Sequence, residues 1–290
     1  MTTNAPTWFA TQYANRAMHI YQNQGNRLRP MVTQATRIEG AEKAVFWLAG
    51  KSKANKKTRN QRNVPSNSER KKFEVALQTW KVFDTVEEYD LDRMTVDEKE
   101  IVYQSGAMAL GRATDIEVYA VMKTAVTAVT GLDFTSGAFS AANALTLCKA
   151  LQDDKVPWDG QVYCGLPSLQ WNQLLANKVV NSADHVGGDL PFTKATDTRF
   201  WNGVNWFLQV EEDAQDLYPV PASNQQDLFI WHKSAVGWGN HTDMQVIPQW
   251  DNYEDWWTIN MTAKGCATTM QEGKGIKRFR TSTNSAIAIV

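Results

Sequence analysis

Apolar residues alternate with polar ones along two stretches in the first third of the chain. Val45-Phe46-Trp47-Leu48 reads as one strand. In the second, Phe73, Val75 and Leu77 alternate, and Trp80, Val82 and Val86 continue in the opposite phase, which predicts a bulge or bend near Gln78. Between them lies a long polar segment. The pattern predicts an extended hairpin from about Arg37 to Phe83 with a polar tip.

Helical periodicity replaces alternation after residue 95. Thr95-Val96-Asp97-Glu98 is a capping box, in which the Thr hydroxyl and the Glu carboxylate accept from backbone N–H groups at a helix start. The next stretch, 101–129, contains no proline and ends near Gly131. We expect a single helix of roughly 33 residues, about 50 Å long. We expect one face of it to pack on strands of the same subunit: Val102, Ala109, Ala113, Ile116 and Ala120.

The rest of the chain mixes helices and strands. Helices are expected over 140–153 and 167–175, and strands over 161–165, 204–210, 228–233, 244–249, 256–262, 265–270 and 276–279. The fold class is therefore α+β. We divide the chain into an N-terminal arm (1–36), an extended hairpin (37–83), a region with the long helix (84–135, with late strands from about 243–262), and an α/β lobe with closing strands (136–242 and 263–290).

Charge is segregated along the chain although the net charge is only −1. Residues 51–72 hold nine cations and one anion, and residues 84–100 hold eight acids and two cations. Such separation suits contacts between copies of a chain. We therefore predict inter-subunit contacts through both segments, at Lys51, Lys53, Lys56, Lys57, Arg59, Arg62, Arg70, Lys71, Lys72, Asp84, Glu87, Glu88, Asp90 and Asp92.

The N-terminal segment carries aromatic residues among many Asn and Gln, with no sustained period. Trp8, Phe9 and Tyr13 are the members that we expect to dock on a neighbouring subunit, because so many aromatics are costly to leave in water. The arm is thus predicted to be an assembly element outside the subunit core.

Candidate chemistry is sparse. The four histidines (19, 185, 232 and 241) and three cysteines (148, 164 and 266) have no metal-ligand spacing, and the chain has no phosphate-binding glycine loop, nucleophile elbow or dinucleotide fingerprint. We expect no enzyme, cofactor or metal site. No apolar run approaches 18 residues, so no membrane span is expected.

Nucleic-acid binding is an alternative for the basic segment, since lysine and arginine contact phosphates. Single-strand binders interleave aromatics for base stacking, and no aromatic lies between Trp47 and Phe73, which disfavours that class but leaves generic backbone contact open.

Several motifs together resemble the major capsid proteins of tailed bacteriophages with the HK97-type fold. The order of arm, hairpin, long helix and α/β lobe is similar, and the likeness covers nearly the whole chain. Local segments that carry it are Leu28-Arg29, Gly40, 109–115 (ALGRATD), 162–167 (VYCGLP) leading into Trp171 and 174–175 (LL), 229–237 (FIWHKSAVG), 265–267 (GCA) and 275–276 (GI).

The resemblance implies a virion protein that assembles in the cytoplasm of a host bacterium. Its implied partners are itself, as hexamers and pentamers, a portal, packaged double-stranded DNA and possible decoration proteins. Relatives with a fused scaffold carry a helical extension before the arm, and this chain shows none, so a separate scaffolding protein is expected. A cellular nanocompartment shell of the same fold, resembling encapsulins, is the alternative.

Overall fold

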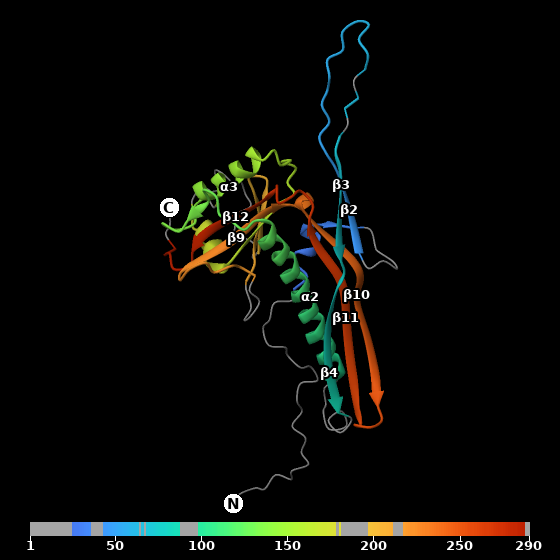
Figure 1. The fold of residues 1–290 in the computed structure, drawn as a ribbon. Helices are drawn as coiled ribbons and strands as arrows, with labels where there is room; N and C mark the ends of the chain where they lie inside the picture. Colours follow the sequence, from blue (N-terminus) through green and yellow to red (C-terminus); the bar gives the residue numbers. More distant parts are fainter. Residues whose placement is uncertain are drawn as a thin grey trace, which may run out of the picture.

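The structure is a computed structural model, which describes residues 25–35, 43–63, 65–66, 68–87, 98–177, 180, 197–210 and 217–287. It is elongated, with a hairpin projecting at one end and a long helix and ribbon running to the other (Figure 1). Residues 95–97 of the capping box lie outside the described residues. The aromatics at 8, 9 and 13 and the acids at 88, 90 and 92 lie outside them as well.

The peripheral part is one long helix against a four-stranded sheet of order β1-β10-β11-β4. These elements are α2 (Glu98–Ala125), β1 (Thr33–Gln34), β4 (Gln78–Glu87), β10 (Val236–Asp251) and β11 (Trp256–Thr269). Ile259 and Met261 of β11 alternate toward α2 and meet Leu110 there. Gly106 lets the helix approach closely, since a Cβ at that position would lie 1.9 Å from the Met261 methyl carbon.

The axial part is built on a six-stranded sheet of order β5-β12-β9-β6-β8-β7. Its strands are β5 (Asp133–Phe134), β6 (Val162–Leu166), β7 (Thr198–Trp201), β8 (Val204–Leu208), β9 (Gln225–His232) and β12 (Ile276–Ser282). The helices α3 (Ala141–Asp153) and α4 (Ser168–Leu175) pack on it. The largest core cluster lies here, and β9 is buried along seven of its eight residues, as expected for a central strand with a continuous apolar run.

The hairpin pairs β2 (Lys43–Ala49) with β3 (Arg70–Ala76) in antiparallel register, as the alternation predicted. Phe46 on its inner face packs against Gly237, where a Cβ would lie 2.8 Å from the ring. At Leu77 the chain leaves the β2–β3 ladder, and from Gln78 onward it pairs with β11. The phase slip predicted near Gln78 therefore coincides with a change of partner strand.

The prediction of which face of α2 is buried is partly wrong. Ile116 is 36% exposed, whereas Leu110 is 4% exposed and Val118, Tyr119 and Met122 are buried. Val102 does pack on the peripheral cluster. The helix also ends at Ala125, six residues before Gly131, and Arg278 donates to the carbonyls of residues 126 and 127 just beyond its end.

This correction makes a testable prediction. Leu110→Asp places an unpaired carboxylate between α2 and β11 and should lower the free energy of unfolding by several kcal/mol, about 3 or more. Ile116→Asp, on the partly exposed side, should cost about 1 kcal/mol or less. Urea unfolding of the unassembled subunit measures both. Similar losses for the two variants would contradict this assignment of the buried face.

Candidate assembly surfaces

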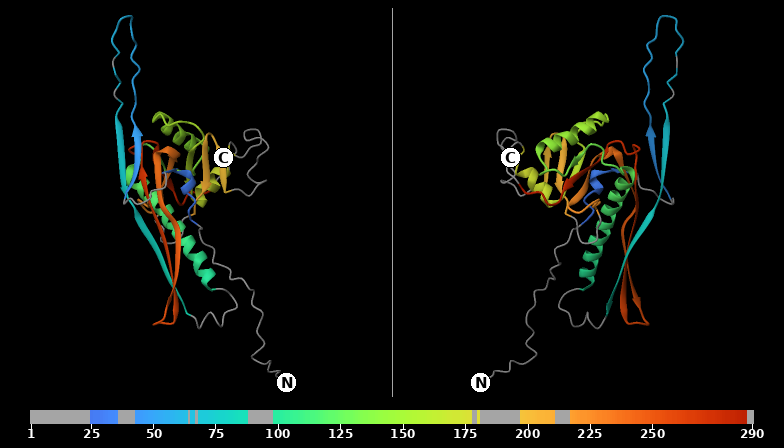
Figure 2. Two further views of the ribbon diagram at one scale, coloured as in Figure 1. Left: turned by 90° about the vertical axis from the view of Figure 1, so that its right-hand side faces the viewer. Right: turned by 60° about the vertical axis from the view of Figure 1, so that its left-hand side comes forward.

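The hairpin tip, residues 50–69, is a cationic projection with little internal structure. Residues 50–63 are all exposed, and they include Lys51, Lys53, Lys56, Lys57, Arg59 and Arg62. Local hydrogen bonds order the tip. The Thr58 backbone N–H and hydroxyl donate to Gln61 Oε1, at 3.1 and 2.9 Å, and the Lys53 N–H donates to Ser66 Oγ at 2.9 Å. Because little of it is buried, the tip is available to another molecule (Figure 2).

The cations at the base of the hairpin are engaged within the subunit. Lys71 forms an ion pair with Glu272, which raises the pKa of Lys71 and lowers that of Glu272. Lys72 pairs with Glu74 and lies 5.8 Å from the centre of the Trp47 ring. Arg70 is exposed. The predicted inter-subunit set thus divides into a projecting group, 51–62, and a base in which Lys71 and Lys72 already have partners.

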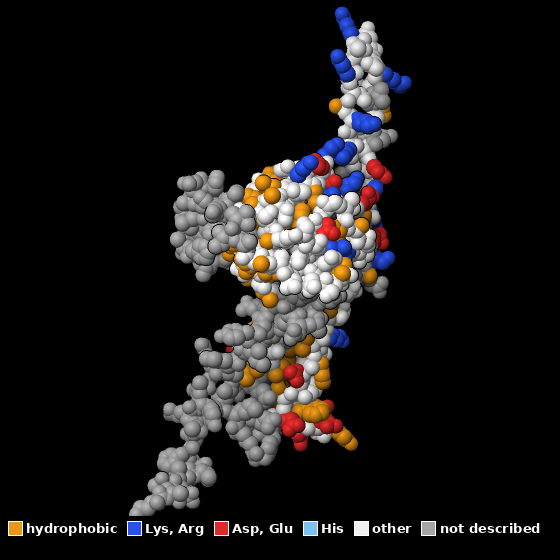
Figure 3. Space-filling view, turned by 90° about the vertical axis from the view of Figure 1, so that its left-hand side faces the viewer, with side chains coloured by type: hydrophobic (Ala, Val, Ile, Leu, Met, Phe, Trp, Pro, Cys, Tyr) orange, Lys and Arg blue, Asp and Glu red, His pale blue; other side chains and the backbone are white. Residues whose placement is uncertain are grey.

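The acidic side of the molecule lies at the opposite end. Asp84 and Glu87 are exposed on β4, and the turn that joins β10 to β11 adds acids that the sequence analysis did not single out: Asp251, Glu254 and Asp255. Figure 3 shows Asp and Glu side chains gathered with hydrophobic ones at this end and Lys and Arg along the tip. Within one subunit the two sets cannot neutralise each other. The clustering of acids and aromatics over 250–257 was the available sequence signal.

The described part of the N-terminal arm is anchored in its own subunit. Leu28 and Val32 are fully buried in the main core cluster, which corrects the expectation that the whole arm lies outside the core. The N–H groups of Arg27 and Leu28 donate to the Asp115 carboxylate at 3.1 and 3.0 Å. Gly25 lies so close to α2 that a Cβ would come within 2.1 Å of the Arg112 nitrogen.

The buried carboxylate of this anchor has an unusual proton affinity. Burial raises the pKa of Asp115 to about 6, against the opposing effect of the two backbone N–H groups and of the Arg27 charge. Arg27 itself donates to the Leu208 carbonyl at 2.7 Å and pairs with Asp197 at 2.5 Å. The anchor therefore joins the arm, α2 and the axial sheet.

A pH dependence follows from Asp115. Its pKa in the folded subunit lies above that in the unfolded chain, so its contribution to stability is full below about pH 4 and is lost as the pH rises through about 6. The difference in unfolding free energy between wild type and Asp115→Asn should therefore fall by about 2–3 kcal/mol between pH 4 and pH 7. Urea unfolding of unassembled subunits at several pH values measures this difference. A constant or rising difference would show that the carboxylate is not desolvated in the folded state.

The described residues contain no arrangement typical of a metal centre or a reactive thiol. No three His, Cys, Asp or Glu side chains among them could hold a metal ion, and all three cysteines are buried, with burial raising the pKa of each thiol. His232 lies between Asp159 and Ser234, at 3.0 and 2.7 Å. Because the Ser234 backbone N–H also donates to the His232 ring, this group caps the short helix η3 (Lys233–Ala235).

Two histidines, 19 and 185, lie outside the described residues. None of the helices in the described ranges combines the length and apolar character needed to cross a bilayer.

The comparisons with known proteins agree with this architecture. A family model described as phage capsid protein matches residues 5–278. No curated protein matches the sequence. The capsid structure of the cyanophage P-SCSP1u is similar, with a TM-score of 0.71 and 12% identity, over 96% of this chain and 94% of that chain.

Two further solved structures are similar over nearly their full length. The capsid of a native GTA particle has a TM-score of 0.70 and 10% identity, over 97% of both chains. The capsid of the cyanophage Pam1 has a TM-score of 0.69 and 11% identity, over 99% of this chain and 100% of that chain. At these identities, the structures establish the likeness of the fold.

Proposed function

The chain belongs to the phage capsid protein family, and we propose that the shell it forms encloses double-stranded DNA as the head of a tailed phage. The fold is HK97-like, and the protein is a major capsid protein that assembles with itself into a shell. These findings do not favour the two alternatives, a shell protein of a cellular compartment and a nucleic-acid-binding protein.

The observation that carries the mode of assembly is the separation of charge along an elongated subunit. The cationic tip and the acids Asp84 and Glu87 lie at opposite ends (Figures 1 and 3). Contacts between them must then join different copies, with the tip of one subunit over β4 and the start of α2 of a neighbour. The acids at 88, 90 and 92 follow Glu87 in the sequence and are proposed to take part in the same contact, and Trp8, Phe9 and Tyr13 of the arm are proposed to dock on a neighbour as well.

Partners beyond the shell protein are also proposals. Hexamers and pentamers of the chain would build the closed shell, with a portal and a scaffolding protein for assembly and with decoration proteins as possible additions. We place assembly in the cytoplasm of the host bacterium. Exposed lysine and arginine side chains provide non-specific contacts with packaged DNA.

Electron microscopy of the purified full-length protein, expressed with and without the other phage head genes, tests this proposal. We expect closed shells, and in complete particles we expect DNA that resists added nuclease. Shells filled with protein cargo instead of DNA would favour the compartment, and soluble monomers that bind DNA without forming shells would overturn the proposal.

A further inference from the structure

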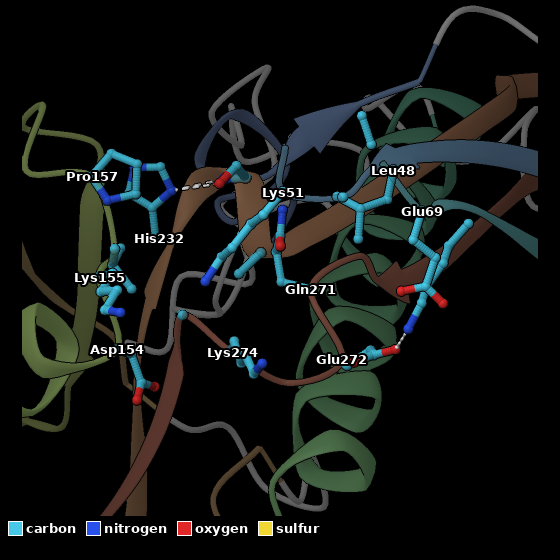
Figure 4. Close-up of a pocket in the computed structure, with 17 residues that line it drawn as sticks. Leu48, Lys51, Glu69, Asp154, Lys155, Pro157, His232, Gln271, Glu272 and Lys274 are labelled. Carbon is cyan, nitrogen blue, oxygen red and sulfur yellow. Dashed lines mark hydrogen bonds and ion pairs between the residues drawn. The ribbon is translucent and has the colours of Figure 1, made fainter. Parts of the chain in front are cut away.

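A pocket of about 330 Å³ lies where the hairpin meets the axial part, and we call it the root pocket. Leu48, Val156 and Pro157 are among its apolar lining residues. Figure 4 shows Leu48 and Pro157 with lysines that come from three separate segments: Lys51 from the hairpin, Lys155 from the loop after α3, and Lys274 from the turn before β12.

The rim of the root pocket is cationic once internal pairs are considered. Glu272 is paired with Lys71, and Asp154 is paired with Lys277 at 2.8 Å. Glu69, which lies near Lys71, is the remaining carboxylate of the described lining, against the three lysines named above. An apolar floor with such a rim suits an aromatic or aliphatic side chain flanked by acids.

The turn between β10 and β11 presents a group of that kind. Tyr253 is 95% exposed, the highest value among the large hydrophobic residues that the structure describes as exposed. Asp251, Glu254 and Asp255 flank it. The turn is ordered by its own contacts. Asp251 Oδ1 accepts from the Tyr253 N–H at 2.9 Å, and the ring centroids of Trp250 and Trp257, on the two strands that the turn joins, are 5.4 Å apart.

The turn and the root pocket lie at opposite ends of one ribbon. The strand β10 begins at Val236, next to the pocket residues Ser234 and Ala235, and β11 ends at Thr269, just before Gln271 of the pocket. A 16-residue strand spans about 50 Å. A subunit therefore cannot place Tyr253 in its own root pocket, and Tyr253 can enter such a pocket only in another copy.

We propose that Tyr253 of one capsid subunit inserts into the root pocket of a neighbouring copy, with the acids of the turn facing its lysine rim. This contact rests on the proposed self-assembly and is separate from the contact of the hairpin tip. It is head-to-tail, so every copy can donate one turn and accept another, which suits repetition through a shell. A buried tyrosine at the centre of a polar rim is typical of an interface anchor.

Engineered disulfides test the contact in assembled particles. The native cysteines are all buried, so Tyr253→Cys with Gln271→Cys should, on oxidation, give dimers and longer linked chains on a non-reducing gel. Val220→Cys with Gln271→Cys is the matched control, because Val220 is 67% exposed but lies elsewhere on the surface, and we expect no ladder from it. Normal particles of the first pair without a ladder, or equal ladders from both pairs, would overturn the proposal.

A charge exchange covers the case in which the cysteine pair does not assemble. Lys274→Glu should reduce the yield of particles by about tenfold or more, and adding Glu254→Lys should restore it to about half the wild-type yield or better. Wild-type yield from Lys274→Glu alone, or no rescue by Glu254→Lys, would overturn the contact. Failure of the wild-type chain to form shells would instead overturn the proposed function.

Discussion

Reversing the charge of four tip residues, Lys56, Lys57, Arg59 and Arg62, to glutamate is expected to abolish shell formation while the subunit stays folded. All four side chains are exposed and make few contacts with the rest of the subunit, so their replacement should change the unfolding free energy by about 0.5 kcal/mol or less. In the proposed contact with a neighbour, however, attraction turns into repulsion. Because the proposed contact would repeat around the shell, these losses would accumulate.

Two further variants separate charge from other effects of substitution. Replacing the same four residues with glutamine should give particles in reduced yield, since only attraction is removed. The stability of these particles should be lower than that of wild-type particles and should depend less on salt. Adding Asp84→Lys and Glu87→Lys to the glutamate variant should restore part of the yield. Sedimentation and electron microscopy measure particles, and circular dichroism checks folding. Normal particles from the glutamate variant would contradict the tip contact.

Asp227→Ala is expected to cause the largest loss of stability among single substitutions outside the apolar core. Asp227 is fully buried on β9 and pairs with Arg278 and Arg280 of β12, each at 2.7 Å. Removing the carboxylate leaves two guanidinium groups without their counter-charge. Breaking a buried pair in this way costs about 3–5 kcal/mol. Arg278 also donates to the Thr127 carbonyl at 3.1 Å, so the loss should loosen the end of α2.

The matched control for this variant is Glu74→Ala, which removes a carboxylate from exposed pairs with Lys72 and Lys43 on the hairpin. It should change the unfolding free energy much less than Asp227→Ala, because exposed ion pairs contribute little to stability. Urea unfolding of unassembled subunits compares the two variants directly. Equal and small losses would show that the arginines find other partners when Asp227 is absent.

Strand alternation was sufficient to predict much of the fold. The hairpin, the buried β9 and the ribbon of β10 and β11 all follow runs of alternating or continuous apolar residues, although the two expected strands over 256–262 and 265–270 are one strand, β11. The face of α2 could not be read in the same way. Its buried side includes Gly106, which allows close approach to Met261, and Asp115, which accepts a hydrogen bond from the backbone of the arm. Because neither residue has a large apolar side chain, apolar spacing pointed to Ile116 instead.

The candidate surfaces were predictable only in part. Charge runs in the sequence identified the tip and the acids of β4, because each lies within one local segment. The root pocket joins residues from the hairpin, the loop after α3, η3 and the turn before β12, and no local pattern brings these together. The acids at 251, 254 and 255 are too few to form a run, and they matter because a tight turn places them around Tyr253.

One residue, Leu77, separates two independent hydrogen-bond ladders. Residues before it pair with β2, and residues after it pair with β11. The hairpin can therefore change its angle to the peripheral sheet by rotation at Leu77 without breaking ladder bonds in either sheet. In a closed shell, five-fold and six-fold surroundings require one sequence to meet its neighbours at different angles. The break at Leu77 lets the same subunit occupy such quasi-equivalent positions with both strand ladders intact, while the side-chain packing at the hairpin base, as of Phe46 on Gly237, adjusts.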